Sequence, residues 1–266
     1  MRPNDLPRWT SASQLATYAA CPRRYELKYV LGMVPERRST AVALGSAVHG
    51  AIEWWFEQRV ADAEPELHDA LRIARADLEA GLAAEDVEWR DATRDSLATQ
   101  AAGLVRLFLE QYGELDVRAV EVPFELPIID PSTGRQMPRT LVGYFDLVLT
   151  NGNVVEIKTV RAAYSPVALR VGLQFAAYRT AARYEGGDIE VIALVKTKSP
   201  RVQHVVLPHD GDVSRWFMLT AARIERAILA GHFPPSPGPM CANCEYRGTC
   251  LGLSTELTEE HDAEAA

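Results

Sequence analysis

The sequence predicts an α/β fold, in which a sheet-containing core follows a helical N-terminal half. Two observations predict it. Residues 11–113 place apolar side chains at helical spacing, whereas residues 114–232 contain strand-like runs joined by turns and two further helical segments. The expected order is therefore a set of helices followed by β-β-β-α-β-β-α, which is typical of an α/β sandwich with helical additions.

Helical segments are expected throughout the N-terminal half. Ser11 or Ser13 is a suitable N-cap for the first segment, and Pro22 either breaks this segment or begins its second helix. The last segment is strongly amphipathic, with apolar side chains along one face. The predicted helices span residues 11–31, 42–60, 65–85 and 90–113.

The second half alternates between strands and helices. Ser165-Pro166 begins a helix that is expected to end at Gly186-Gly187, because proline suits the first turn and glycine the C-terminal cap. A final helix is expected near 211–231. The predicted strands lie at about 117–128, 139–149, 153–160, 189–197 and 202–207.

Composition limits the class of protein. The chain has 266 residues, 47% of them hydrophobic, and a formal charge of −8. No apolar run has transmembrane length and the N-terminus lacks an apolar signal region, so a cytoplasmic protein without a membrane partner is expected. The acidic total does not favour nonspecific nucleic-acid binding, although a basic groove can coexist with an acidic surface. Residues 1–10 are expected to be flexible, and residues 253–266 an acidic disordered tail.

Three charged residues flank an Asn-Gly turn in the run GYFDLVLTNGNVVEIKT. Asp146, Glu156 and Lys158 lie among apolar strand residues, where an unpaired charge is costly. Two carboxylates and an ammonium group are the components of a Mg²⁺ or Mn²⁺ site that stabilises a phosphoryl transition state. The alternative is a cross-strand ion pair without metal chemistry.

The length of the turn decides whether the two carboxylates meet. A two-residue loop would pair Leu147 with Glu156 and turn Asp146 to the opposite face, because side chains alternate along a strand. A three-residue loop over 150–152 pairs Asp146 with Glu156 on one face. We predict that the hairpin is not of the two-residue kind.

Four cysteines form a second constellation: Cys21, Cys241, Cys244 and Cys250. Two disulfides are conceivable, but no export signal places the chain in an oxidising compartment. A zinc site is a further alternative, although such sites usually pair two short Cys-x₂-Cys knuckles. One distant cysteine joined to a Cys-x₂-Cys-x₅-Cys cluster is more typical of iron–sulfur ligation, which would tie the two chain ends together.

Two helical pairs complete the candidates. His49 and Glu53 share a helical face in GSAVHGAIEWW, and a neutral imidazole is a good ligand for a divalent metal. Gln174 and Tyr178 share a face in LQFAAYRTAARY. Taken alone, each pair is typical of ordinary packing.

Together, these residues resemble the motif series of the PD-(D/E)XK nuclease superfamily, and more narrowly of the RecB-type nucleases. The series is His49, Asp146, Glu156-Ile157-Lys158 and Gln174-x-x-x-Tyr178. The four-cysteine layout and the opening SASQLATYAACPRRYELKYV are similar to the AddB nuclease domain and to CRISPR-associated RecB-like exonucleases, which carry a 4Fe–4S cluster. Phe145 stands where the superfamily's name has proline, a position without chemistry.

The resemblance covers residues 10–252 and implies a restriction-endonuclease-like mixed β-sheet core flanked by helices. It implies a single nuclease domain over 11–252. Its parts are a helical part at about 11–113, an α/β core at about 114–232 and a cysteine segment at 233–252. No helicase motif accompanies it, so a stand-alone nuclease is expected.

The resemblance also assigns roles. Asp146, Glu156 and Lys158 would be catalytic, with Lys158 orienting or helping to deprotonate the attacking water. The implied metal ligands, for Mg²⁺ or Mn²⁺, are His49, Asp146, Glu156 and the carbonyl of Ile157. The implied DNA-binding residues are Gln174 and Tyr178. The implied ligands of the 4Fe–4S cluster are Cys21, Cys241, Cys244 and Cys250.

The expected function is a metal-dependent DNA exonuclease that prefers single-stranded DNA or DNA ends. The alternative is a non-catalytic DNA-end-binding module of the same fold. The exonuclease function would suit DNA repair, phage DNA processing or CRISPR adaptation. The chain could also form a homo-oligomer or bind a recombination or CRISPR adaptation partner.

Overall fold

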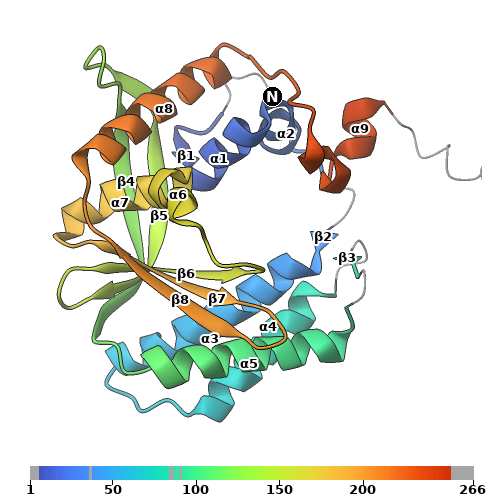
Figure 1. The fold of residues 1–266 in the computed structure, drawn as a ribbon, viewed down its shortest axis with the longest axis vertical. Helices are drawn as coiled ribbons and strands as arrows, with labels where there is room; N and C mark the ends of the chain where they lie inside the picture. The colour runs from blue at the N-terminus through green and yellow to red at the C-terminus, as the bar shows by residue number, and fades with distance from the viewer. Residues whose placement is uncertain (1–5, 36–37, 84–86, 90–91, 253–266) are drawn as a thin grey trace, which may run out of the picture.

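A six-stranded mixed sheet forms the centre of the computed structural model, which describes residues 6–35, 38–83, 87–89 and 92–252 (Figure 1). Strands β4, β5 and β6 pair antiparallel in succession, β6 and β7 pair parallel, and β7 and β8 pair antiparallel. The strands are β1 (Trp9–Ser11), β4 (Val117–Ile129), β5 (Gln136–Leu149), β6 (Val154–Val160), β7 (Ile189–Val195) and β8 (Arg201–Leu207). The predicted mixed sheet is thereby confirmed.

Helices cover the sheet on both sides, as the resemblance implied. Helices α3, α4 and α5 pack below β6, β7 and β8 in Figure 1, whereas α1, α7 and α8 lie against β4 and β5 above. Short strands β2 (Arg38–Ser39) and β3 (Val87–Glu88) form a separate parallel pair. The helices are α1 (Ala12–Ala20), α2 (Pro22–Tyr25), α3 (Thr40–Val60), α4 (Leu67–Gly81), α5 (Arg94–Tyr112), α6 (Pro166–Val171), α7 (Leu173–Ala182), α8 (Gly211–Leu229) and α9 (Arg247–Leu251).

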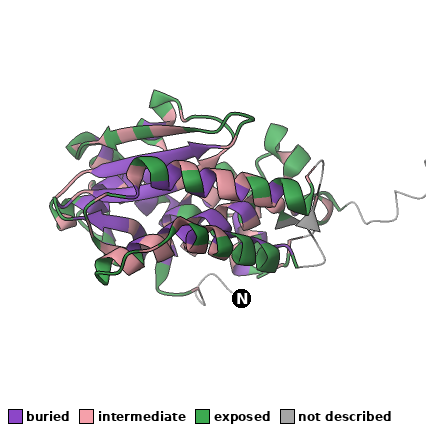
Figure 2. Cartoon of the chain, turned by 90° about the horizontal axis from the view of Figure 1, so that it is seen from below, coloured by how far each residue is buried: buried purple, intermediate pink, exposed green. Residues whose placement is uncertain are grey.

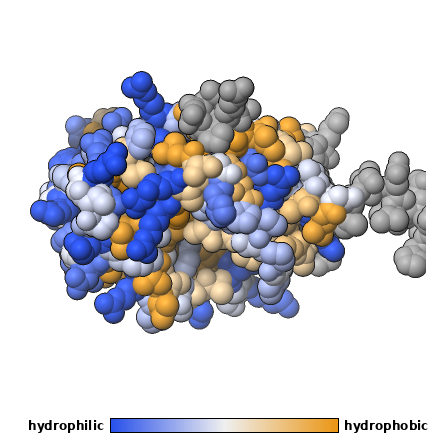
Figure 3. All heavy atoms as spheres, turned by 90° about the horizontal axis from the view of Figure 1, so that it is seen from above, coloured by the Kyte–Doolittle hydropathy of each residue, from blue (hydrophilic) through white to orange (hydrophobic). Residues whose placement is uncertain are grey.

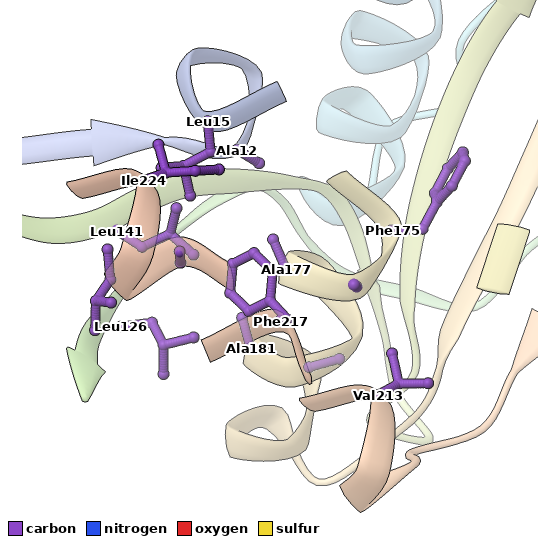
Figure 4. Close-up of a cluster of buried hydrophobic side chains, with 14 of the residues drawn as sticks. Ala12, Leu15, Leu126, Leu141, Phe175, Ala177, Ala181, Val213, Phe217 and Ile224 are labelled. Carbon is purple, nitrogen blue, oxygen red and sulfur yellow. The ribbon is translucent and has the colours of Figure 1, made fainter. Parts of the chain in front are cut away.

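Two hydrophobic clusters fill the spaces between the sheet and these helices. The upper cluster joins Leu126 of β4 and Leu141 of β5 to Ala177 of α7 and Phe217 of α8 (Figure 4). The lower cluster packs α3, α4 and α5 against β5, β6 and β7. Figure 2 shows the result: buried strands lie between helices whose outer sides are exposed. Strand β7 is buried along its whole length, which explains its nearly continuous apolar run.

Local signals set several helix ends. The side chain of Ser11 accepts a hydrogen bond from the amide of Gln14, so Ser11 is the N-cap of α1. Pro22 begins α2 after an extended Cys21, and Glu26–Val30 continue as a π-helix. The segment 166–185 differs from the single predicted helix, because Gly172 is extended and separates α6 from α7.

The N-terminal region also departs from expectation. Residues 1–5 and the predicted tail 253–266 lie outside the described residues, but Trp9–Ser11 form strand β1 instead of a flexible segment. Strand β1 pairs parallel with β5, a contact over 130 residues of chain that local sequence patterns do not reveal. None of the described helices is long and apolar enough to cross a membrane. The face seen in Figure 3 mixes hydrophilic and hydrophobic side chains.

Candidate active site

The turn between β5 and β6 has the odd length that the sequence predicted. Leu147 pairs with Val155, and the amide of Leu149 donates to the carbonyl of Asn153 at 2.8 Å, which leaves a three-residue loop. Gly152 has φ +89° in this loop, a conformation that glycine adopts readily. The same register, continued along the strands, sets Asp146 opposite Glu156. The two carboxylates therefore share one face of the sheet.

The sheet divides beside these carboxylates. Strand β4 pairs along almost the whole of one edge of β5, so β1 and β6 must share the other edge. Strand β1 pairs with residues 140–142, and β6 pairs with residues 147 and 148. A cleft of about 590 Å³ lies at this division. Its lining includes five of the predicted site residues: Asp146, Glu156, Lys158, Gln174 and Tyr178.

Glu156 is the most buried charge of the cleft, with 2% of its surface exposed. Its Oε1 atom pairs with the ammonium group of Lys158 and accepts a hydrogen bond from Gln174 Nε2 at 3.0 Å. Its Oε2 atom is buried and has no hydrogen-bond partner among the residues that the structure describes. Burial and the nearby charge of Asp146 raise the pKa of Glu156, while Lys158 lowers it. A buried carboxylate oxygen without a partner is rare in folded proteins and indicates a site for a ligand.

Asp146 lies between Glu156 and helix α3. Its Oδ2 atom accepts a hydrogen bond from the amide of Ile157 at 2.6 Å and lies 3.8 Å from Nδ1 of His49. Burial lowers the pKa of His49, although Asp146 opposes this effect, so a neutral imidazole faces the carboxylate near neutral pH. The fold therefore brings His49 from α3 to the carboxylate pair of β5 and β6.

Glu121 is a site residue that sequence reasoning missed. The pairing of β4 with β5 continues through position 121, which sets Glu121 opposite Asp146 on the side away from Glu156. Its backbone has φ +47°, which is uncommon for a residue other than glycine. Burial, followed by the charges of Asp146 and Glu53, raises the pKa of Glu121 to about 7. No motif marks it, because its place depends on the register in which β4 pairs with β5.

Helix α7 supplies the two residues that were expected to bind DNA. Gln174 contacts Glu156, so its amide helps to orient a carboxylate. The ring of Tyr178 packs edge-on against Phe124 and Phe145, at centroid distances of 5.2 and 5.8 Å. Burial raises the pKa of Tyr178, and the carboxylate of Glu156 adds to this. Both residues line the cleft, and contact with DNA stays a prediction.

The donor set fits a hard divalent cation, since it combines carboxylate oxygens with one imidazole. The unpartnered oxygen of Glu156 supports this fit. Within the described ranges, however, no group of three or more His, Cys, Asp and Glu side chains is spaced to hold a metal ion. Lys158 pairs with one oxygen of Glu156, and Nδ1 of His49 lies 3.8 Å from Oδ2 of Asp146.

Helix α2, which follows Cys21, lies near the segment 241–250 that carries the other three cysteines (Figure 1). All four are free thiols and partly buried. Arg24 of α2 forms an ion pair with Glu245 at 2.8 Å, and the hydroxyl of Tyr246 donates to the carbonyl of Met33. Burial raises the pKa of Cys244, and Cys21 lies close enough to add to this effect. The predicted approach of Cys21 to the C-terminal segment is thus present, without a described metal-binding group.

The model of the PD-(D/E)XK nuclease superfamily matches residues 10–251. No curated protein matches the sequence. Among solved structures, the chain is similar to a candidate exonuclease from Eubacterium rectale, with a TM-score of 0.54 and 12% identity, over 90% of this chain and 88% of that one. It is also similar to SSO0001, with a TM-score of 0.46 and 13% identity, over 93% and 88% of the two chains.

Proposed function

Because the chain belongs to the PD-(D/E)XK nuclease superfamily, we propose that it is a metal-dependent DNA exonuclease acting on single strands or DNA ends. One observation carries the proposal. Asp146 and Glu156 face each other across β5 and β6, and a buried oxygen of Glu156 has no partner although Lys158 stands beside it. A purely structural ion pair would satisfy its own buried atoms.

The residues of the cleft suit hydrolysis of a phosphodiester bond. His49, Asp146, Glu156 and the carbonyl of Ile157 would hold the cation. A bound Mg²⁺ or Mn²⁺ would polarise the phosphate and the attacking water. The ammonium group of Lys158 would orient that water and offset the charge of the phosphate. Gln174 would keep the carboxylate of Glu156 in place, and together with Tyr178 would position the DNA strand.

We further propose a structural 4Fe–4S cluster held by Cys21, Cys241, Cys244 and Cys250. Four free thiols and the packing of α2 against the segment around Glu245 support this proposal. After anaerobic purification, we expect a brown protein with about four iron atoms per chain, and loss of both colour and iron in Cys241→Ser. Zinc in place of iron in the purified protein would contradict the proposal.

The test of the nuclease uses end-labelled single-stranded DNA with Mn²⁺ or Mg²⁺. We expect progressive shortening by the wild type, none with EDTA, and a fall of about 10²–10³-fold in kcat for Lys158→Ala, because a charge that stabilises the transition state is lost. Lys198→Ala is the matched control, since Lys198 is exposed and lies outside the cleft. DNA that is bound but not shortened by the wild type would leave a DNA-end-binding module of the same fold.

A further inference from the structure

The cleft continues beyond the carboxylates along β5, and two aromatic side chains line this extension. Tyr144 precedes Asp146 by two residues and therefore points to the same face of the sheet. Trp9 of β1 lies beside Thr140, a further four residues back along β5. At the rise of a strand, Tyr144 stands about 7 Å and Trp9 about 20 Å along β5 from Asp146.

Both aromatic rings are accessible. Tyr144 is 55% exposed and Trp9 is 46% exposed, although each belongs to a strand of the central sheet. The other rings of the cleft, Phe124 and Tyr178, are packed against each other. Trp9 and Tyr144 thus present free ring surface along one path that leads to the catalytic residues.

The charged side chains that line the cleft indicate which kind of ligand could lie along Trp9 and Tyr144. Among the described residues, the lining of the cleft carries the carboxylates of Glu125, Asp146 and Glu156 and one cation, Lys158, which already pairs with Glu156. The part of the lining that the structure describes therefore lacks the cluster of basic side chains through which proteins hold the phosphates of a duplex. Stacking on aromatic rings requires bases whose faces are open, as in a single strand.

We propose that Trp9 and Tyr144 form a stacking platform for unpaired bases of the DNA strand that enters the active site. This inference rests on the proposed function and names its substrate class. Tyr144 would receive a base next to the scissile phosphate, and Trp9 a base further along the same strand. The platform selects single strands because the bases inside a duplex are stacked on each other and have no free faces to offer.

The test measures binding without cleavage. A fluorescent single strand of about 15 nucleotides and a blunt duplex of the same sequence are titrated with protein in EDTA, and anisotropy gives each Kd. We expect Trp9→Ala and Tyr144→Ala each to raise the Kd for the single strand about 5- to 100-fold. We expect Trp9→Phe and Tyr144→Phe to retain most of the affinity, because the ring remains.

Matched controls come from exposed aromatic residues outside the cleft. Trp216 of α8 is 39% exposed and Tyr184 is 75% exposed, and we expect Trp216→Ala and Tyr184→Ala to bind single strands like the wild type. A cooperative thermal unfolding transition is the check that each variant is folded. If Trp9→Ala and Tyr144→Ala lost affinity for single strand and duplex equally, or if both bound single strands like the wild type, the proposal of a stacking platform would be wrong.

Binding and cleavage fail independently in this design. If the wild type binds single strands through these rings but does not shorten DNA with Mn²⁺, the platform stands and the exonuclease falls. If the wild type shortens DNA while Trp9→Ala and Tyr144→Ala keep its Kd, the exonuclease stands and the platform falls.

Discussion

Two buried groups of charged residues in this protein have opposite character. Arg139 of β5 and Glu225 of α8 are 3% and 0% exposed, and the guanidinium group donates to Glu225, Gln14 and the carbonyl of Trp9. Its remaining donors also reach partners, the carbonyl of Pro7 and the hydroxyl of Tyr25. The carboxylates of the cleft, in contrast, repel one another and leave Glu156 Oε2 without a partner.

The contrast separates a structural role from the catalytic role that we propose for the cleft. The group around Arg139 joins β1, α1 and α8 to β5, so its hydrogen bonds hold the fold together. The cleft keeps like charges close together, which costs stability unless a cation or substrate joins them. A buried charged group therefore indicates a binding or catalytic site mainly when some of its polar atoms have no hydrogen-bond partner.

The largest expected effect comes from breaking the satisfied group. Arg139→Met should lower the free energy of unfolding by about 3–5 kcal/mol, because Glu225 is left buried without its partner. Chemical denaturation measures this loss. The double variant Arg139→Met/Glu225→Leu should recover most of it, since both charges are then gone.

A matched exposed pair provides the control for this prediction. Arg59 and Glu114 form an ion pair at 3.0 Å, but the side chain of Glu114 is 85% exposed. Arg59→Met should therefore cost less than about 1 kcal/mol. Equal losses for Arg59→Met and Arg139→Met would mean that the buried group contributes no more than a surface pair.

The smaller effect comes from relieving the unsatisfied group. Burial and the charges of Asp146, Glu53 and Glu57 raise the pKa of Glu121 from 4.5 to about 7. A carboxyl group with a raised pKa in the folded state costs no stability below pH 4.5, where it is protonated in both states. The cost grows as the pH rises towards 7 and is complete above it.

Glu121→Gln should therefore stabilise the protein above pH 7, by about 1 kcal/mol after allowance for its solvent exposure. The gain should shrink as the pH falls and vanish below pH 4.5. Denaturation curves in EDTA from pH 4 to 8 measure it, and EDTA keeps divalent cations from the carboxylates. Glu125→Gln, which changes a carboxylate that lines the cleft, is the control. A gain that is independent of pH would contradict the assigned cause.

Much of the fold and of the site could be predicted from local patterns. The helices and strands follow from apolar periodicity, which reflects contacts within one element. The hairpin between β5 and β6 follows from the turn, because a three-residue loop fixes which side chains share a face. Motif spacing was sufficient to single out His49, Asp146, Glu156 and Lys158, which the fold brings together.

The positions of Trp9 and Glu121 depend on how the strands pair in the sheet, which local sequence patterns do not predict. The pairing of β1 with β5 brings Trp9 to the cleft, and the pairing of β4 with β5 brings Glu121 to Asp146. The partners of Arg139 come from residues 7–25 and from Glu225 of α8, both far from Arg139 in the chain. The sequence by itself determined the fold class and the catalytic candidates, because these are written in short-range patterns. Only the tertiary structure decided which charges are satisfied and where the cleft leads, because burial and partners arise from contacts between distant residues.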